Sequence, residues 1–300
     1  MQKIKGLKRE KAFYKAIYFS GLLIVLLVIA IFITLFIRSL PAIRHSGAGF
    51  VFAKEWDPNS KIFGIAPFIA GTLITSFLAL IICLPFSLAI SILLGEYFRT
   101  GRFAGFIKSM VEIMAGVPSV SYGFWGLYVL IPLVQKLEIK FGIIPPYGAG
   151  ILTASLILAV MIIPYAASLG RESIELVPSD IKEAAYSLGS TRFEVVRKIV
   201  LPYSASGIIA GIILSLGRAL GETMAVTMVI GNAPYFPESI FSLGNTLSSL
   251  IANEFVESDT QLHQSALIYA GLILFVITAI VNMAGRMVTG KLAMKGGNNA

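Results

Sequence analysis

The chain has 300 residues, of which 56% are hydrophobic and only 13% are charged. That composition excludes an ordinary soluble domain, in which about 25% of residues are charged. The formal net charge is +8, but no basic patch is interleaved with aromatic residues as in a nucleic-acid-binding surface. The single cysteine, Cys83, excludes a framework of disulfides or a cysteine-rich metal site, and we expect it to be a small core residue.

Six long runs with few or no charges account for the apolar composition. Each is longer than the roughly 18 apolar residues that make a membrane-spanning helix the expected structure. The runs cover residues 17–37, 67–95, 113–135, 149–170, 203–231 and 264–285. The first follows a basic tail and is too long for a signal-peptide core, so it is predicted to remain as an anchor.

The tails and the loops between these runs alternate between rich and poor in Lys and Arg. Tails 1–16 and 286–300 and loops 96–112 and 171–202 hold most of the 24 Lys and Arg residues. Because basic loops stay in the cytoplasm, the pattern predicts that both termini are cytoplasmic. The tail 1–16 is expected to contact anionic lipid rather than nucleic acid.

The first external loop, 38–66, contains the aromatic segment 50–58. These aromatic residues could mark the outer membrane interface, or they could form part of a surface for an extracytoplasmic binding protein. Both interpretations stay open from the sequence.

The third run contains Gly116, Pro118 and Ser119 close together. Proline removes a backbone donor and glycine lowers helix propensity, so a bend or an unwound turn is predicted here. The bend could be a packing kink, or it could be a broken helix that lines a pathway.

Residues 177–202 form the longest charged interval between two apolar runs. We expect a short helix opened by Pro178 and Ser179, a break at Gly189, a second short helix and a stop at Pro202. Asp180 and Glu183 have the spacing of a capping box. A polar hairpin of this kind is either a solvated connector or a helix presented to a groove on a soluble partner.

The fifth run carries two charges, Arg218 and Glu222. Arg218 lies fifteen residues beyond Tyr203, about 22 Å along a helix. On one continuous helix Glu222 shares its face, so an ion pair is predicted. The pair could only fix helix register, or it could belong to a pathway, where intramembrane charges are usually found. The candidate pathway or gating residues are Arg218, Glu222, Thr223 and Ser119.

The same run has a Gly207–Gly211 spacing that allows close approach of another helix. In loop 232–263 apolar residues recur at helical spacing and predict an amphipathic helix on the outer face. These residues are Ile240, Leu243, Leu247, Leu250, Ile251 and Phe255.

The polar hairpin contains a recognisable signature: EAA, a glycine four residues after the second alanine, and I-x-L-P beginning ten residues later. It resembles the loop of ABC-importer permeases, which implies docking of this loop into a cleft of a separate ATPase. Small alanines allow close approach and glycine allows the sharp turn. The coupling residues are then Glu183, Ala184, Ala185, Gly189, Ile199, Leu201 and Pro202.

A second string, GRALGETMAVTMVIGN, is similar to permeases for oxyanions and most closely to the PstC-type phosphate permeases. LSSLIANEF, EWDP, PFIAGTLITS and GVPSVSYGFWGL agree with that family. The resemblance implies phosphate import in a bacterial or archaeal cell membrane, with a PstA-like permease, a PstB-like ATPase dimer and a PstS-like phosphate-binding protein. Sulfate or molybdate is the alternative substrate.

The expected fold is all-α, with six transmembrane helices and a type I ABC importer permease core. The parts are a basic tail at 1–16, a peripheral first helix and its loop at 17–66, a five-helix core at 67–287 with the EAA loop at 178–202, and a tail at 288–300. No cofactor is expected on this chain, because it lacks the G-x-x-x-x-G-K-[ST] motif; ATP and Mg would bind the ATPase.

Two other classes are weaker. No G-x-S-x-G or H-E-x-x-H motif supports an intramembrane hydrolase, and neither histidine lies within an apolar run. A secondary transporter could use the two charges of the fifth run but has no need of a complete EAA hairpin.

Overall fold

A computed structural model describes the backbone of residues 2–297 and the side chains of residues 13–291. The first half contains α1 (Gln2–Ser46), α2 (Gly49–Phe52), β1 (Trp56–Asp57), β2 (Ile62–Phe63), α3 (Ala66–Ile92), η1 (Leu93–Tyr97), α4 (Arg102–Gly116), α5 (Ser119–Trp125), η2 (Gly126–Leu130) and α6 (Ile131–Lys140). The second half contains α7 (Ile151–Glu175), α8 (Ser179–Ser187), α9 (Arg192–Val195), η3 (Val196–Val200), α10 (Leu201–Leu220), α11 (Met224–Thr227), α12 (Leu247–Glu254) and α13 (Gln261–Gly297). The three η elements are single π-helical turns.

Five of the described helices are long and apolar enough to cross a membrane, and a bent pair brings the number up to six. The pair consists of Arg102–Gly116 and Ser119–Lys140, which meet at 96°. The six-span prediction is therefore confirmed with one span broken. The break falls at Val117 and Pro118, where the sequence predicts it, but the first half of this span begins at Arg102 rather than at residue 113.

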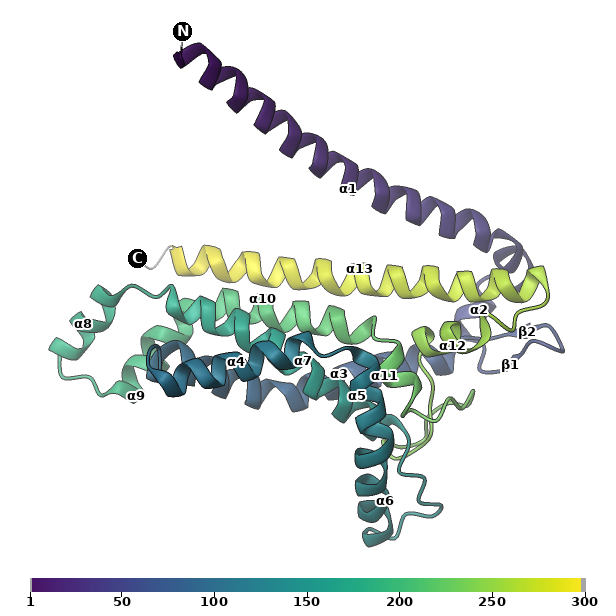
Figure 1. Cartoon of the computed structure of the whole chain (residues 1–300). Helices are drawn as coiled ribbons and strands as arrows, with labels where there is room; N and C mark the ends of the chain where they lie inside the picture. Colours follow the sequence, from purple (N-terminus) through teal and green to yellow (C-terminus); the bar gives the residue numbers. More distant parts are fainter. Residues whose placement is uncertain (1, 298–300) are drawn as a thin grey trace.

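The spans α3, α7, α10 and α13 lie side by side, and α1 diverges from them (Figure 1). We call the end that carries α8 and α9 the hairpin end, and the end that carries β1, β2 and α12 the loop end. The start of α1 and the end of α13 both lie toward the hairpin end in Figure 1, as an even number of spans requires. The second half of α1 packs on α13: the Phe32 ring centroid lies 5.9 Å from that of Phe275, and the Ser265 hydroxyl donates to the Arg38 carbonyl at 2.8 Å.

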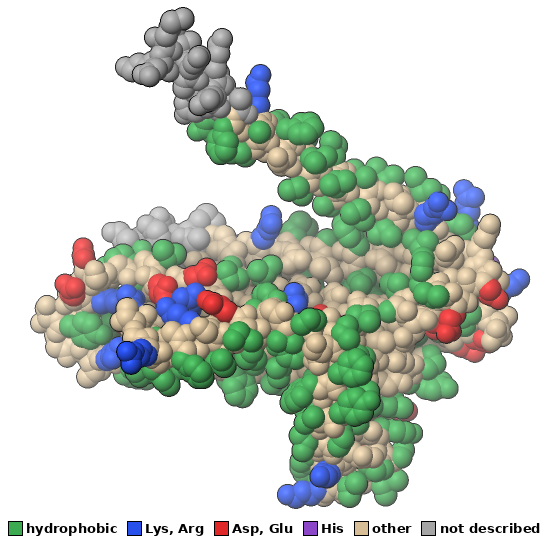
Figure 2. All heavy atoms as spheres, in the orientation of Figure 1, with side chains coloured by type: hydrophobic (Ala, Val, Ile, Leu, Met, Phe, Trp, Pro, Cys, Tyr) green, Lys and Arg blue, Asp and Glu red, His purple; other side chains and the backbone are tan. Residues whose placement is uncertain are grey.

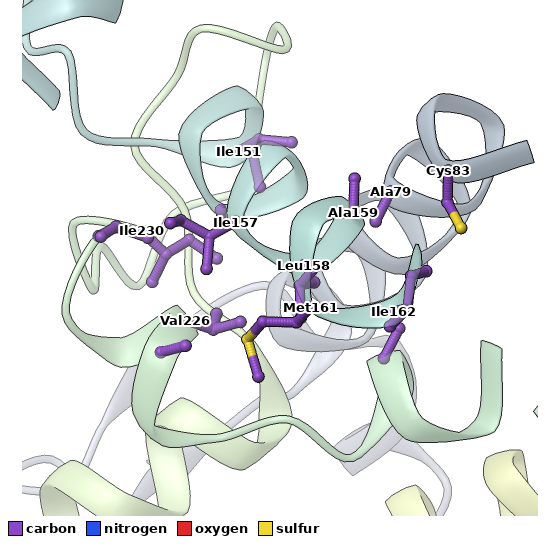
Figure 3. Packing of buried hydrophobic residues seen from close by; sticks show 14 of the residues in the cluster. Ala79, Cys83, Ile151, Ile157, Leu158, Ala159, Met161, Ile162, Val226 and Ile230 are labelled. Carbon is purple, nitrogen blue, oxygen red and sulfur yellow. The ribbon is translucent and has the colours of Figure 1, made fainter. Parts of the chain in front are cut away.

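The centre of the bundle is α7, the most buried of the spans. Ile157, Leu158 and Ile162 of α7 pack against Ala79 and Cys83 of α3 and against Val226 of α11 (Figure 3). Cys83 is fully buried there, which confirms its predicted role as a small core residue. Apolar contact in lipid offers little driving force, so close packing of small residues holds such spans together.

Glycines make that close packing possible. Gly207 of α10 leaves no room for a side chain beside Ser173 of α7, and Gly211 faces Leu169 in the same way. The close approach predicted from the Gly207–Gly211 spacing is confirmed, and its partner is α7. Ser91 of α3 donates to the Ala167 carbonyl at 3.0 Å and so joins a third span to this contact.

A separate aromatic core closes the loop end. The β-hairpin pairs Trp56 with Phe63, and both side chains pack with Phe50 and Phe68. The Trp56 indole donates to Glu254 at 2.9 Å. Phe50 and Trp56 are buried, so of the loop's aromatic segment only Phe52 is left exposed. Neither sequence interpretation of this segment holds for the two buried rings, which stabilise the fold instead.

The predicted amphipathic helix in loop 232–263 is only partly correct. The helix is restricted to α12, and its residues Leu247 and Leu250 are fully buried against α3 and α13. Ile240 lies in irregular chain and is exposed. The apolar periodicity there reflects burial in the fold rather than a helix on the membrane surface.

One contact between α3 and the loop end leads to a stability prediction. The carbonyl of Asn245 occupies the place of a Cβ at Gly71, whereas Gly105 of α4 has open space around it. We expect Gly71→Ala to cost about 1–3 kcal/mol by overpacking and to lower the thermal unfolding midpoint of the purified protein. Gly105→Ala is the matched control and should leave the midpoint unchanged or raise it, since alanine favours helix. Equal midpoints for the two variants would contradict the contact.

Candidate functional site

The polar hairpin, residues 178–202, projects from the bundle at the hairpin end (Figure 1). Helix α8 starts after Pro178 as predicted. It ends in a Schellman motif, in which Gly189 N donates to the Tyr186 carbonyl at 2.9 Å and Ser190 N donates to the Ala185 carbonyl at 3.1 Å. Gly189 has φ +84°, a conformation that residues with a side chain rarely adopt. The predicted break at Gly189 is confirmed.

The capping box lies elsewhere than predicted. Asp180 is inside the first turn of α8, so it cannot cap that helix. The box is formed by Thr191 and Glu194 at the start of α9: the Thr191 hydroxyl accepts from Glu194 N, and the Glu194 carboxylate accepts from Thr191 N at 3.0 Å. The T-x-x-E signal was present in the sequence and was missed.

The predicted stop at Pro202 is wrong. The helix runs without interruption from Arg192 to Leu220. The π-helical turn η3 precedes Pro202, and there Leu201 N bonds to the Val196 carbonyl five residues back. The shifted hydrogen bonding places Pro202 at the first turn of α10, where a missing backbone donor is tolerated.

The two alanines of the signature face opposite ways. Ala185 is 8% exposed and packs with Ile174, Val195 and Ile208 of its own chain. Glu183 and Ala184 are exposed. The expectation that Ala185 faces a partner is therefore wrong, because the outward face of α8 carries its neighbour. Ile199 and Leu201 are half-buried and Pro202 is exposed.

Several apolar side chains of the hairpin are exposed, although the hairpin lies at the end of the molecule where charged residues gather. Leu188 is 88% exposed and Phe193 is 64% exposed, and Ile181 and Tyr186 are also exposed. Basic and acidic side chains surround this tip (Figure 2). An exposed apolar patch with a polar rim is typical of a surface that binds another protein.

The second candidate region lies where α10 ends inside the bundle. The helix stops at Leu220 with Gly221 as its cap, so Arg218 belongs to the last turn and Glu222 lies beyond it. The predicted ion pair is wrong for this reason: the two residues do not share a helix face. Among residues 13–291 no carboxylate oxygen lies within 4.0 Å of the Arg218 guanidinium.

Arg218 instead lies over an aromatic ring. Its guanidinium carbon is 4.3 Å from the centroid of the Tyr165 ring of α7. Glu222 accepts from Ala225 N at 3.4 Å, at the start of α11. Thr223 is the N-cap residue of α11, and its carbonyl accepts from the Thr227 hydroxyl at 2.7 Å. The pathway candidates near the end of α10 are thus a cation on a ring and a carboxylate at the next helix start.

Tyr165 connects Arg218 to the broken span. Its hydroxyl donates to the Ala115 carbonyl at 2.9 Å, and Tyr122 of α5 donates to the Met114 carbonyl at 2.8 Å. Both carbonyls belong to the last turn of α4, so the tyrosines tie this turn to α7 and α5; the Met114 carbonyl also accepts from Val117 N at 3.4 Å. Ser119 begins α5 directly after this break and is half-buried. No local sequence pattern identified the two tyrosines, since their roles depend on residues far along the chain.

The two interrupted spans contact each other. Gly123 of α5 lies against Met228 and Ala225 of the α11 segment with no room for a side chain. Irregular backbone at membrane depth is tolerated only inside a protein or beside a water-filled cavity. The two breaks therefore meet near Arg218, which is exposed on this chain.

This fold and hairpin define a membrane permease subunit, and the chain belongs to the family of binding-protein-dependent transport system inner membrane components, whose profile matches residues 87–293. The phosphate transport system permease protein PstC of Pasteurella multocida is 42% identical over 96% of this chain and 94% of that protein. The probable PstC of Methanocaldococcus jannaschii is 35% identical over 94% of both chains. An inward-facing structure of the MetNI methionine ABC transporter covers 76% of this chain and 94% of that chain, with a TM-score of 0.55 and 17% identity.

Proposed function

We propose that this chain is a permease subunit of an ATP-driven importer that carries inorganic phosphate into the cytoplasm. The relatives that match nearly its whole length are named phosphate transport permeases. The structural observation that carries the proposal is Arg218, a cation without a carboxylate partner among the described side chains, beside two broken spans. A guanidinium fork suits phosphate oxygens, and the membrane interior screens their charges poorly.

The transporter works through other subunits. A second, PstA-like permease would complete the pathway, because Arg218 is exposed on this chain alone. Two PstB-like ATPases would supply energy from ATP and Mg, and one of them would bind the polar hairpin through Ala184, Leu188 and the apolar residues around them. A PstS-like protein would deliver phosphate at the loop end. Hydrolysis of ATP is then assigned to the partner and not to this chain.

The hairpin end is assigned to the cytoplasm of a bacterial or archaeal cell. Lys and Arg are concentrated in the connections and tails of that end, as the positive-inside rule requires. The start of α1 and the end of α13 lie toward the same end (Figure 1). The loop end would then face outward, with acidic residues and no Lys or Arg in residues 232–263.

Thiol labelling tests this orientation. In a background with Cys83→Ala, single cysteines at Ser60 and Val256 should react with an impermeant maleimide in intact cells, because both positions are exposed at the loop end. A cysteine at Ser187 of the hairpin should react only after the cells are opened. Labelling of position 187 in intact cells would reverse the assignment.

Substrate competition tests the proposed function itself. Radiolabelled phosphate uptake should be lost in cells that lack this chain and should return when it is restored. A tenfold excess of unlabelled phosphate should compete, whereas sulfate and molybdate should not. Competition by sulfate or molybdate would favour the alternative oxyanion. Uptake that survives ATP depletion and requires a proton gradient would instead favour a secondary transporter.

A further inference from the structure

A buried ion pair joins the polar hairpin to α3. The Lys182 ammonium of α8 donates to the Glu96 carboxylate of η1 at 2.5 Å, and both side chains are only 8% exposed. Glu96 also accepts from Arg99 at 3.2 Å. Burying two charges costs solvation energy, and their attraction offsets that cost only when the two groups are held in good geometry. This contact therefore fixes α8 against the end of α3.

The second limb of the hairpin binds the same turn. Arg192 of α9 donates to the Glu96 carbonyl at 2.9 Å, and its guanidinium carbon lies 4.2 Å from the centroid of the Tyr97 ring. Gly95 of the same turn packs on Ile174 of α7 with no room for a side chain. The turn η1 therefore contacts α8, α9 and the end of α7 together.

Helix α3 runs from this turn to the loop end. There the Thr72 hydroxyl accepts from Leu247 N at 3.0 Å, at the start of α12. Gly71 lies beside the Asn245 carbonyl. One continuous element, α3 followed by η1, thus contacts the polar hairpin at one end and the segment 245–247 at the other.

We propose that Glu96 is a positioning residue that makes the polar hairpin and α3 move as one body, so that a force applied to the hairpin reaches the loop end through α3. The inference rests on the proposed function, in which an ATPase moves the hairpin. Neither Glu96 nor Lys182 contacts transported substrate in this mechanism. Their contribution is to the coupling between ATP hydrolysis and transport.

A double-mutant cycle tests the pair in the complete transporter reconstituted in vesicles. Glu96→Gln and Lys182→Met should each lower the phosphate imported per ATP hydrolysed by about tenfold, a typical size for coupling between sites. The ATPase rate should stay within about twofold, because hydrolysis occurs on the partner. The double variant should be no worse than Glu96→Gln alone, since Glu96→Gln already removes the Lys182 contact together with the Arg99 contact. Lys182→Arg should retain coupling.

Lys198→Met is the matched control. Lys198 pairs with Glu194 at 3.1 Å in the same hairpin, but its side chain is 70% exposed, and such surface pairs contribute little. The control should import phosphate at the wild-type ratio to ATP. If Glu96→Gln left the phosphate imported per ATP hydrolysed unchanged, either because both rates fell by the same factor or because neither fell, the proposal would be overturned.

Cross-linking tests the same inference by restoring a coupling that the substitutions have removed. A Glu96→Cys/Lys182→Cys double variant, in a Cys83→Ala background, lacks the ion pair and should be uncoupled. A short bifunctional thiol reagent that joins the two cysteines should restore import per ATP, whereas a monofunctional reagent should not. If the hairpin had to move relative to α3, the cross-link would block import and the proposal would fail.

A measurement without substrate separates this inference from the proposed function. Spin labels at Ser187 of α8 and Ile81 of α3, again without Cys83, report the distance between hairpin and helix in the purified chain. Glu96→Gln should broaden that distance distribution and Lys198→Met should not. A broadened distribution in a complex that moves no phosphate would leave the inference standing and reject the proposed function. An unchanged distribution would reject the inference alone.

Discussion

Arg218→Gln is expected to lower phosphate uptake by at least about a hundredfold, equivalent to about 2.7 kcal/mol of barrier. The guanidinium lies on the Tyr165 ring without a carboxylate partner within 4.0 Å among the described side chains, so its charge is available to a passing anion. Arg218→Lys should recover little, because an ammonium cannot offer the planar fork that binds two phosphate oxygens. The measurement is initial uptake rate in vesicles, with the amount of assembled complex determined in parallel.

A variant that exchanges the charges of Arg218 and Glu222 tests whether these charges only stabilise the fold. Because Glu222 is not paired with Arg218, the variant Arg218→Glu with Glu222→Arg should be as inactive as Arg218→Gln. Arg286→Gln is the control, since Arg286 is an exposed arginine on α13 that lines a groove with Ala210 and Leu214 of α10 and does not lie on the Tyr165 ring. Wild-type uptake by the exchanged variant would show that the charges only hold the fold, and the pathway role of Arg218 would be abandoned.

Ala184→Trp is expected to detach the ATPase and to reduce uptake to background. Ala184 lies on the exposed face of α8, where a large ring would prevent close docking. Gly189→Val should have the same result for a different reason, since φ +84° costs a β-branched residue about 1–3 kcal/mol. Co-purification of the ATPase with the tagged permease measures both effects.

Matched substitutions identify the docking face. Ala184→Ser keeps the small size and should bind the ATPase normally, and Lys198→Trp places the same ring on an exposed position outside α8. Ala185→Trp should instead reduce the amount of folded permease, because Ala185 is buried against Ile174 and Val195. If Ala185→Trp yields normal permease that lacks ATPase while Ala184→Trp binds it, the assigned face is wrong.

The number of spans and the charge asymmetry could be predicted from sequence because both depend on local composition. A segment in lipid must satisfy its own backbone hydrogen bonds, so an apolar run of sufficient length predicts a helix without knowledge of its neighbours. The breaks at Pro118 and Gly189 followed from backbone chemistry in the same way. The hairpin signature likewise indicated the family before any packing was known.

Details that depend on neighbours could not be predicted in this way. Helical periodicity shows which residues share a face but not which face meets the protein. Both Ala184 and Ala185 were therefore predicted to dock on the ATPase, and only the packing of α8 against Ile174 and Ile208 shows that Ala185 is buried. The end of α10 at Gly221 and the turn through η3 at Pro202 were also missed. Each involves hydrogen bonding that a run of apolar letters does not reveal.

The sequence by itself determined a permease of about six spans with a polar hairpin, because hydropathy, charge bias and glycine chemistry act within short segments. Only the tertiary structure decided that Arg218 lies on Tyr165 instead of pairing with Glu222, and that Lys182 pairs with Glu96. Residues 218 and 165, like 182 and 96, are far apart along the chain. Their contacts exist only because α3, α7 and α10 pack together, and that packing is a property of the whole fold.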